Sequence, residues 1–328
     1  MILVTGGAGF IGSNLHAALA ARGQPCIVAD WLGTEGKWRN LARHPPARIV
    51  RPEALDAFLA TDPAIPAIIH LGANSETTAT DADELWETNV ELSWRLWTWC
   101  AQHEARFIYA SSASTYGNGD QGFDDDPALL ARLRPLNLYG WSKHAFDLRV
   151  AAAQAAALAA GSPAPAQSVG LKFFNVYGPN EYHKGPMISV VKRKYDEVAA
   201  GAPARLFRSD RPGLPDGAQQ RDFIWVGDVV DALLWLLDHP EVNGLYNLGT
   251  GAARTYLDLA HAVAAAAGQP PRVEFVPMPD PLRGQYQSYT QARMDRLRAA
   301  GYPGQFTPLE DGVRRYVQQH LSGPERYV

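Results

Sequence analysis

The stretch TGGAGFIGS, residues 5–13, lies directly between the apolar run ILVTG (2–6) and the helical pattern FIGSNLHAALAARG (10–23). Its glycines are spaced three apart, at Gly6, Gly9 and Gly12. A chain that turns sharply from a strand into a helix and approaches a pyrophosphate with bare backbone requires glycine at such points. The helix N-terminus adds partial positive charge for the phosphates. The stretch therefore predicts a dinucleotide-binding turn at the start of a βαβ unit.

Asp30 ends the next apolar run, CIVAD (26–30), 24 residues after Gly6. A carboxylate at this place ordinarily binds the ribose 2′-hydroxyl and favours NAD. Lys37 and Arg39 follow in WLGTEGKWRN, where a cation can meet a 2′-phosphate or can belong to a solvated loop. Because the chain has only 6 lysines beside 24 arginines, Lys37 is the more informative of the two. The residues alone leave the choice between NAD and NADP open.

Short apolar runs alternate with helical patterns through the first half of the chain. The further apolar runs are IPAIIHLGA (65–73), RFIYASS (106–112) and SVGLKFFNV (168–176), and the helical patterns span 83–105 and about 140–160. Because these runs are continuous rather than alternating, each is typical of a strand in a parallel sheet that is buried on both faces. We therefore expect an α/β protein with a Rossmann-type doubly wound parallel sheet.

The texture of the sequence changes after residue 176, where Pro, Gly and Tyr become frequent. A strand–helix pair at 221–240 returns to the earlier style, and the Pro/Gly-rich run 209–220 predicts a surface loop. We expect a dinucleotide-binding Rossmann domain at 1–176 that returns at 221–248 and about 285–300. A smaller, interleaved α/β substrate lobe is expected from 177–220, 249–284 and 301–328.

The composition bounds the kind of function. A formal charge of −4 and a pI near 6.1 give no electrostatic case for nucleic acid, and the acidic run DDD at 124–126 predicts a solvated loop. Cys26 and Cys100 are too few and too far apart for a disulfide framework or a metal site, so we expect buried free thiols in a reducing compartment. No apolar run reaches the roughly 18 residues of a membrane span, and no signal segment precedes ILVTGG. We expect a soluble, cytoplasmic protein without a metal.

The segment LYGWSK (138–143) places Tyr139 and Lys143 four residues apart at the start of a helix, where both point the same way. A nearby ammonium stabilises a phenolate and lowers the tyrosine pKa from about 10 toward neutral pH. Such a base can take a hydroxyl proton while hydride leaves for a nicotinamide. SSASTYG (111–117) ends a predicted strand at the carboxyl edge of the sheet, where Ser112 can hydrogen-bond the reacting oxygen. We interpret Tyr139, Lys143 and Ser112 as a candidate catalytic set.

With these motifs the chain resembles the extended short-chain dehydrogenase/reductase superfamily over its whole length. Within that superfamily it is similar to the ADP-glyceromanno-heptose 6-epimerases, enzymes of lipopolysaccharide inner-core precursor synthesis. The stretches that carry this similarity are LGANSETT (71–78), FNVYGPNEYHKG (174–185), RDFIWVGDV (221–229), YNLGTG (246–251) and RGQYQSYTQA (283–292). The resemblance implies an isomerase that converts ADP-D-glycero-beta-D-manno-heptose to ADP-L-glycero-beta-D-manno-heptose by inverting C6. It also implies NADP held throughout the cycle and a homo-oligomer, a pentamer in this family.

The resemblance further implies which residues bind. The cofactor positions are Gly6, Gly9, Phe10, Ile11, Gly12, Asp30, Trp31, Lys37, Leu71, Gly72, Ala73, Asn74, Ser75, Asn89, Lys143, Val176 and Lys184. The substrate positions are Ser112, Asn175, Pro186, Arg193, Phe207, Arg208, Ser209, Arg221 and Tyr286. Trp31 and Arg193 depart from the family, which has Asn and His at these places.

Lys184, in YGPNEYHKGPM (177–187), has a chemical reason to be lysine. Inversion of an exocyclic carbon through a 6-ketone requires the keto group to rotate, which moves its oxygen away from Tyr139. A second proton carrier must then stand across the pocket, and a lysine can exchange a proton where an arginine stays protonated. The loop after 168–176 falls at the carboxyl edge of the sheet. We predict Lys184 as the second acid/base; the alternative is an ammonium that faces phosphate or solvent.

Three other functions fit parts of the pattern. A nucleotide-sugar 4,6-dehydratase needs an Asp-Glu pair before the Tyr-Gly of the strand-end motif, and this chain has Ala113 and Ser114 there, which cannot act as acid or base. A hexose 4-epimerase keeps the Ser/Tyr/Lys set but has no evident use for Lys184. A non-catalytic NADP-binding regulator typically loses the Tyr or the Lys, and this chain keeps both. No residue pattern identifies the sugar by itself.

Overall fold

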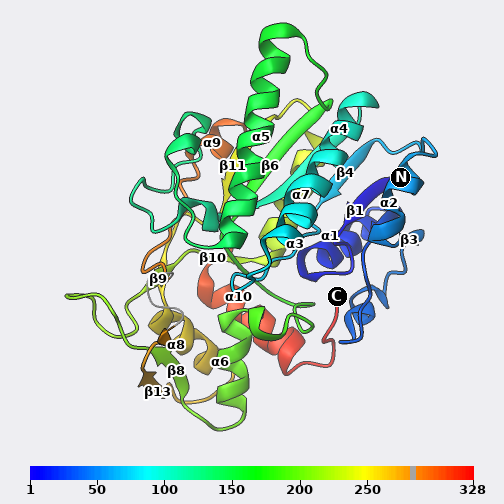
Figure 1. Cartoon of the computed structure of the whole chain (residues 1–328). Helices are drawn as coiled ribbons and strands as arrows, with labels where there is room; N and C mark the ends of the chain where they lie inside the picture. The colour runs from blue at the N-terminus through cyan, green and yellow to red at the C-terminus, as the bar shows by residue number, and fades with distance from the viewer. Residues whose placement is uncertain (281–285) are drawn as a thin grey trace.

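The computed structural model describes residues 1–280 and 286–328 and is built on one large parallel sheet (Figure 1). Its strands lie in the order β11-β6-β5-β4-β1-β2-β3, and every neighbouring pair is parallel. They are β1 (Ile2–Thr5), β2 (Cys26–Ala29), β3 (Arg48–Val50), β4 (Ala67–His70), β5 (Arg106–Ser112), β6 (Gln167–Phe173) and β11 (Gly244–Leu248). The winding direction reverses between β1 and β4, so their carboxyl ends flank the crevice where doubly wound sheets bind ligands. The predicted Rossmann-type fold is confirmed.

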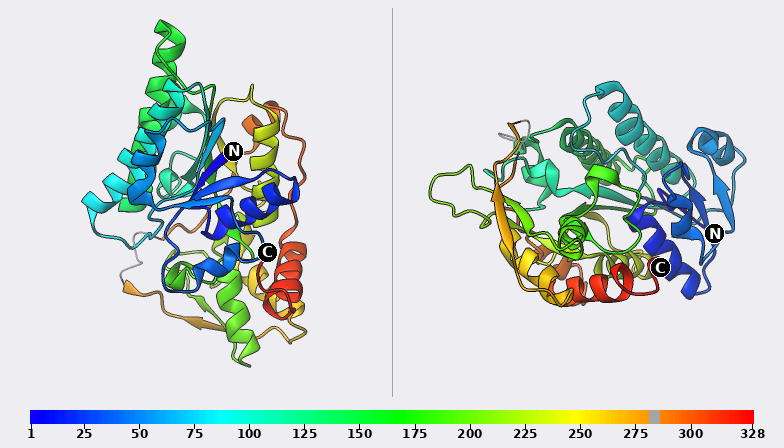
Figure 2. Two further views of the ribbon diagram at one scale, coloured as in Figure 1. Left: turned by 90° about the vertical axis from the view of Figure 1, so that its right-hand side faces the viewer. Right: turned by 90° about the horizontal axis from the view of Figure 1, so that it is seen from below.

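Helices cover both faces of this sheet, as Figure 2 shows. α3, α4 and α5 lie on one face, and α1 and α7 pack against each other on the opposite face. The bounds are α1 (Phe10–Ala21), α2 (Leu55–Leu59), α3 (Ala82–Trp86), α4 (Leu92–Gln102), α5 (Leu138–Ala160) and α7 (Val226–Asp238). Coverage on both faces explains why these strands are continuous apolar runs in the sequence. Among the helices of 1–280 and 286–328, none has the length and apolarity needed to cross a membrane.

Two helices position the candidate catalytic residues. α3 and α4 continue into each other through a π-helical turn, Glu87–Glu91, which contains the completely buried Asn89. Single π turns are rare and frequently occur at functional sites. α5 begins at Asn137, whose side chain accepts a hydrogen bond of 2.8 Å from Gly140 N–H, so Tyr139 and Lys143 occupy the first two turns as predicted.

A smaller group of elements lies below the large sheet in Figure 1. It contains α6 (Val190–Ala199), β8 (Ala204–Phe207), β9 (Gln220–Arg221), β12 (Arg254–Thr255), α8 (Tyr256–Ala266), β13 (Val273–Val276) and α10 (Leu309–Arg315). β8 pairs with β13 and β9 pairs with β12, each as a separate two-stranded sheet. These elements share a second hydrophobic cluster, which includes Val191, Leu206, Val263 and Val313. The cluster supports our proposal of an interleaved lobe, although the boundary at 284/285 lies outside the described residues.

The structure corrects three details of the sequence prediction. The predicted strand 168–176 divides into β6 and β7 (Asn175–Tyr177), because Phe174 N–H bonds Leu248 while Asn175 N–H bonds Asp222. β7 pairs with β10 (Phe223–Trp225) in a small sheet of its own, so the chain after 221 rejoins the large sheet only at β11. The edge strand β3 was not predicted. α9 (Asp295–Ala299) follows β13 along the chain.

Candidate active site

The glycine-rich turn closes tightly on the carboxyl ends of three strands. Gly6 has a φ of +65°, and a Cβ there would lie 2.6 Å from Gly72 N, in the turn after β4. A Cβ on Gly12 would lie 2.2 Å from Gly6 O, and Gly6 N–H also donates to Ala29 O at the end of β2 over 2.8 Å. Only glycine satisfies these approaches, and the resulting cradle at the start of α1 suits a pyrophosphate.

Asp30 and Lys37 form one ionic unit beside this cradle. Lys37 Nζ lies 2.6 Å from Asp30 Oδ1, and Ala8 N–H donates to Asp30 Oδ2 over 2.9 Å. Arg39, by contrast, is exposed and lies over the Trp38 ring. Trp31 is 53% exposed and donates through its indole N–H to Glu53 over 2.7 Å. Of the two cations that the sequence offered, the structure brings Lys37 to the end of β2.

Tyr139, Ser112 and Lys143 come together at the ends of β5 and α5. Ser112 hydrogen-bonds the Tyr139 hydroxyl, and Lys143 Nζ donates to Ala110 O over 2.9 Å. The expected lowering of the tyrosine pKa is not found in the protein alone. Burial raises the pKa of Tyr139 and outweighs the lowering by its hydrogen bond with Ser112. Burial also lowers the pKa of Lys143 to about 8, so the ammonium sits within reach of proton exchange near neutral pH.

A buried ion pair that the sequence did not reveal lies beneath these residues. Asp147, on α5, and Lys172, on β6, are 2.8 Å apart with both side chains 0% exposed. Lys172 Nζ also donates to Thr115 Oγ1, whose hydroxyl donates to Ser112 O over 2.8 Å. The pair therefore ties α5 to the turn that carries Ser112. The spacing Tyr139, Lys143, Asp147 on one helical face was the available signal.

The loop that carries Lys184 packs against the start of α1. Asn14 donates to Pro179 O over 3.0 Å, and Asn180 donates to Ser13 over 3.0 Å. Lys184 Nζ lies 5.4 Å from the centre of the Phe10 ring, and burial lowers its pKa despite the nearby carboxylate of Glu181. Within the described residues the contacts of Lys184 thus run to the glycine-rich turn and not to Tyr139. A proton-exchanging role and a cofactor contact are both compatible with this position.

The candidate substrate residues other than Ser112 fall into three groups. Arg221 is buried, and its guanidinium carbon lies 5.6 Å from the ring centre of Tyr256 and 4.9 Å from that of Tyr286, which also contacts Phe207. Pro186 and Arg193 meet separately, where the guanidinium donates to the proline carbonyl. Asn175, at the start of β7, and Arg208 are exposed, and Ser209 N–H bonds Asp216. Tyr256 was missed because no motif marks it.

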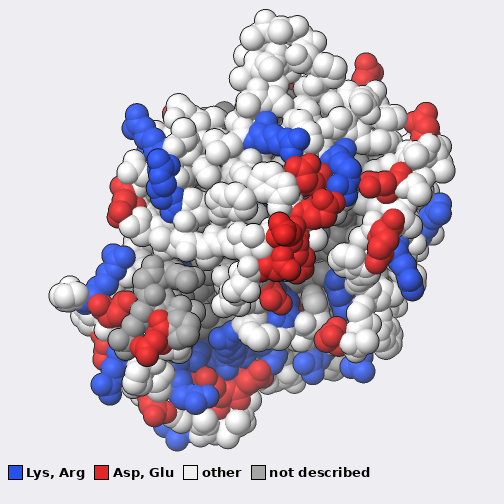
Figure 3. Space-filling model, in the orientation of Figure 1, with Lys and Arg blue, Asp and Glu red and all other residues white. Residues whose placement is uncertain are grey.

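Basic side chains gather over the small lobe near α6 on the face drawn in Figure 3, and acidic side chains gather over α3. A diphosphate group would therefore meet favourable charge on the small-lobe side. Arg193 is exposed on α6.

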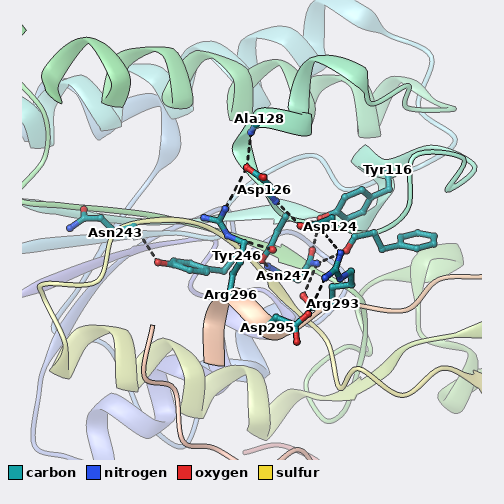
Figure 4. Close-up of polar contacts among 12 residues, drawn as sticks. Tyr116, Asp124, Asp126, Ala128, Asn243, Tyr246, Asn247, Arg293, Asp295 and Arg296 are labelled. Carbon is teal, nitrogen blue, oxygen red and sulfur yellow. Dashed lines mark hydrogen bonds and ion pairs between the residues drawn. The ribbon is translucent and has the colours of Figure 1, made fainter. Parts of the chain in front are cut away.

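The acidic run 124–126 is a loop with Asp126 exposed, but it is not solvated throughout, contrary to the prediction (Figure 4). Asp125 is buried and accepts a hydrogen bond of 2.6 Å from Asn247 N–H, while Asp124 pairs with Arg293 over 2.5 Å. Asn247 also accepts from the Tyr116 hydroxyl over 2.6 Å. These contacts attach the loop before α5 to β11 and to the segment that leads into α9. The prediction failed because the partners of the acidic run lie more than 100 residues away along the chain.

The remaining candidate cofactor residues lie near the carboxyl edge of the large sheet, as the glycine-rich turn does. Gly72 and Asn74 lie in the turn after β4, where Asn74 N–H donates to Asn89 Oδ1 over 2.9 Å. The others near this edge are Gly9 at the start of α1, Ile11 in α1, Leu71, Ala73 and Ser75 around Gly72, and Val176 in β7. No His/Cys/Asp/Glu cluster able to hold a metal occurs within 1–280 and 286–328, where Cys26 and Cys100 are buried free thiols.

The model of the NAD dependent epimerase/dehydratase family matches residues 2–249. The chain belongs to this family. A full-length relative from Nitratidesulfovibrio vulgaris (strain DP4), named ADP-L-glycero-D-manno-heptose-6-epimerase, is 48% identical and is aligned over 100% of both chains. This places the chain among the epimerases of the family, so it is an isomerase.

Two solved structures of the family have the same architecture. A crystal structure of the Helicobacter pylori ADP-L-glycero-D-manno-heptose-6-epimerase is 27% identical with a TM-score of 0.77, covering 96% of this chain and 94% of that chain. The Thermus thermophilus UDP-glucose 4-epimerase in complex with NAD is 29% identical with a TM-score of 0.74, covering 96% and 97%. A nicotinamide cofactor fits the family and the glycine cradle of this chain alike.

Proposed function

We propose that the protein inverts C6 of the heptose in ADP-D-glycero-beta-D-manno-heptose to give ADP-L-glycero-beta-D-manno-heptose. The observation that carries this proposal is Lys184, which lies against the glycine-rich turn. The protein has this lysine in addition to the Ser112–Tyr139–Lys143 set. The full-length relatives with the heptose epimerase name support the substrate.

The first half-reaction uses Tyr139 and Ser112. A nicotinamide held at the glycine-rich turn would supply the hydride acceptor for oxidation of the C6 hydroxyl to a 6-ketone. Tyr139 takes the hydroxyl proton, while Ser112 hydrogen-bonds the same oxygen and disperses its developing charge. Lys143, one turn further along α5, stabilises the negative tyrosine and is held in place by Ala110 O.

The second half-reaction needs a proton at a different place. If the keto group rotates about the C5–C6 bond, its oxygen would no longer face Tyr139. Lys184 would then give the proton to that oxygen, while the reduced nicotinamide would supply the hydride to the opposite face of C6. Burial lowers the pKa of Lys184 and makes its ammonium a usable acid. An arginine in this position would stay protonated and could not complete the cycle.

We propose NADP as the resident cofactor. Lys37 would hold the 2′-phosphate, because an ammonium that bonds Asp30 still has donors left for a phosphate oxygen. Gly6, Gly9 and Gly12 would accommodate the pyrophosphate at the start of α1.

The assignment is tested by incubation with ADP-D-glycero-beta-D-manno-heptose, with the C6 configuration followed by NMR. Conversion to an equilibrium mixture of the two C6 epimers is expected. Turnover of UDP-glucose at C4 without turnover of the heptose would instead make the protein a hexose 4-epimerase, and binding of cofactor without turnover of either would make it a regulator.

We further propose a homo-oligomer, a pentamer by resemblance, that works in the cytoplasm. Cys26 and Cys100 are buried and unbridged, which is compatible with a reducing compartment. Light scattering of the purified protein measures the mass directly. A molar mass near the 35.8 kDa of one chain would contradict the oligomer.

A further inference from the structure

Three buried side chains form an unbroken hydrogen-bond chain between the glycine-rich turn and the π turn. Thr5 Oγ1 lies 2.7 Å from His70 Nδ1, and His70 Nε2 lies 2.7 Å from Ser93 Oγ. The Ser93 hydroxyl donates to Asn89 O over 2.7 Å. His70 is 1% exposed, and Thr5 and Ser93 are also buried.

The contacts at the two ends fix the direction of every proton in this chain. Thr5 Oγ1 accepts the N–H of Gly72 over 3.1 Å, which leaves its own proton for His70 Nδ1. The Ser93 proton is committed to Asn89 O, so Ser93 Oγ accepts from His70 Nε2–H. His70 must therefore be the neutral tautomer with the proton on Nε2. Burial lowers its pKa to about 3, which agrees with this assignment.

Asn89 connects this hydrogen-bond chain to α5, the helix that carries Tyr139 and Lys143. A π turn changes the backbone pairing of an α-helix, and the Ser93 hydroxyl supports the Asn89 carbonyl at this turn. The Asn89 side chain accepts from Asn74 N–H and donates to Asn74 O, both over 2.9 Å. It also donates over 3.0 Å to Ser142, whose hydroxyl donates to Tyr139 O.

The contacts form a closed circuit, since Asn74 and Gly72 belong to the same turn after β4. One part of the circuit holds that turn, where cofactor is expected, and another holds the first turn of α5. The turn at which cofactor is expected is thus connected to the helix start that carries Tyr139. The connection runs through five side chains, those of Thr5, His70, Ser93, Asn89 and Ser142.

We propose that His70 is a positioning residue that keeps Asn89 and the first turn of α5 in register with the turn after β4. His70 acts through Ser93 and Asn89 and touches neither cofactor nor substrate. The inference rests on the proposed function only where turnover is measured.

The test compares His70→Phe, which keeps a ring but removes both hydrogen bonds, with His70→Gln, which keeps a donor for Ser93. In His70→Phe we expect kcat to fall about 10- to 100-fold, because small misplacement of reacting groups costs this much, with KM and bound cofactor unchanged. His70→Gln should recover most of the lost rate. His16→Phe is the matched control, because His16 is also buried and also bonds through both ring nitrogens, to Cys26 and to His44 O.

Two further measurements do not depend on His70→Phe being active. Amide hydrogen exchange should accelerate at Asn89–Ser93 and at Tyr139–Lys143 in His70→Phe and stay unchanged there in His16→Phe. In addition, Thr5→Val and Ser93→Ala each break the chain once, so the double variant should lose no more rate than the worse single variant.

Unchanged kcat and unchanged exchange in His70→Phe would overturn the proposal, as would a His70→Gln variant as slow as His70→Phe. Equal effects of His16→Phe would also overturn it, because the loss would then reflect general destabilisation. If the wild-type protein fails to convert the heptose but the exchange pattern appears, the proposed function fails and the positioning role stands.

Discussion

The ammonium of Lys37 lies 2.6 Å from the carboxylate of Asp30, whose other oxygen accepts the N–H of Ala8. The residue that ordinarily reads a ribose 2′-hydroxyl is thus engaged by the backbone of the glycine-rich turn and by a cation. This arrangement explains how the two sequence signals can occur together. Asp30 fixes Lys37 beside the glycine-rich turn, where we propose that the lysine holds the 2′-phosphate of NADP.

Lys37→Ala should reduce the preference for NADP over NAD at least tenfold, because a charge-assisted bond to a phosphate contributes about 1.5–3 kcal/mol. Binding of each cofactor to the emptied protein, followed by tryptophan fluorescence, measures the ratio. Arg39→Ala is the control and should leave the ratio unchanged. A wild-type protein that releases only NAD on denaturation would show that Lys37 has no such role.

Tyr139→Phe should lower kcat by about 10²–10⁴, the usual contribution of a general base, while the cofactor stays bound. The ring is retained, so its packing is kept and only the proton acceptor is lost. Tyr289→Phe removes a hydroxyl from an exposed tyrosine that contacts Phe123, and should have no effect on turnover. Near wild-type rates for Tyr139→Phe would exclude it as the base.

Lys184→Met and Lys184→Arg should both abolish epimerisation, because neither side chain can exchange a proton near neutral pH. Redox turnover of a 6-aldehyde analogue is measured in a separate assay, so that the two half-reactions can be distinguished. A residue that merely holds the diphosphate would raise KM and leave kcat almost unchanged, and Lys184→Arg would then be largely active. That outcome would disprove the two-base mechanism.

His70 makes stability depend on pH at the acid side. Its folded-state pKa of about 3 lies below the ordinary 6.5, so between these values the unfolded chain binds a proton that the folded protein does not. The contribution of neutral His70 to the free energy of unfolding is therefore fully present above about pH 6.5. Below that pH the free energy of unfolding falls by up to about 1.4 kcal/mol per pH unit as the pH drops toward 3. Urea titrations of wild type and His70→Gln from pH 6.5 to 4.5 should show the shallower slope in the variant. Parallel slopes would contradict the burial of a neutral His70.

Lys172→Met should destabilise the fold by about 3–5 kcal/mol, because it leaves the Asp147 carboxylate buried without its cation. Replacing both residues, as Asp147→Leu with Lys172→Met, should restore much of the loss. Arg22→Ala breaks the exposed pair with Asp238 and should change the free energy of unfolding by less than about 1 kcal/mol. If the double variant is no more stable than Lys172→Met, the loss is not an unpaired charge.

Much of the fold follows from local patterns. The glycine spacing and the continuous apolar runs are local signals, and the predicted strands and helices of the large sheet are confirmed. β3 escaped prediction because it has only three residues at a sheet edge, two of them exposed, so no apolar run marks it. The break between β6 and β7 was hidden for the opposite reason, since the apolar run continues through Phe174.

The site was only partly predictable, because its electrostatics depend on contacts distant in sequence. Tyr139 and Lys143 could be paired from their spacing, but burial, which raises the tyrosine pKa, is a property of the folded protein. Asp147 shares their helical face, yet its partner Lys172 comes from another strand. His70 reads in the sequence as part of a buried strand, and only the structure shows that both ring nitrogens are used.

The strand order has a consequence for the newly made chain. β6 pairs with β11 along its outer edge, but β11 begins about 70 residues after β6 ends, and the first part of the small lobe lies between them. At ordinary rates of synthesis the ribosome needs on the order of ten seconds to make that interval. During this interval the outer edge of β6 has unpaired backbone N–H and C=O groups. β6 is seven residues long, and almost all of these residues are buried in the finished fold. Slow codons between the two strands would lengthen this exposure. A chaperone that covers β6 would keep its open edge from pairing with another chain.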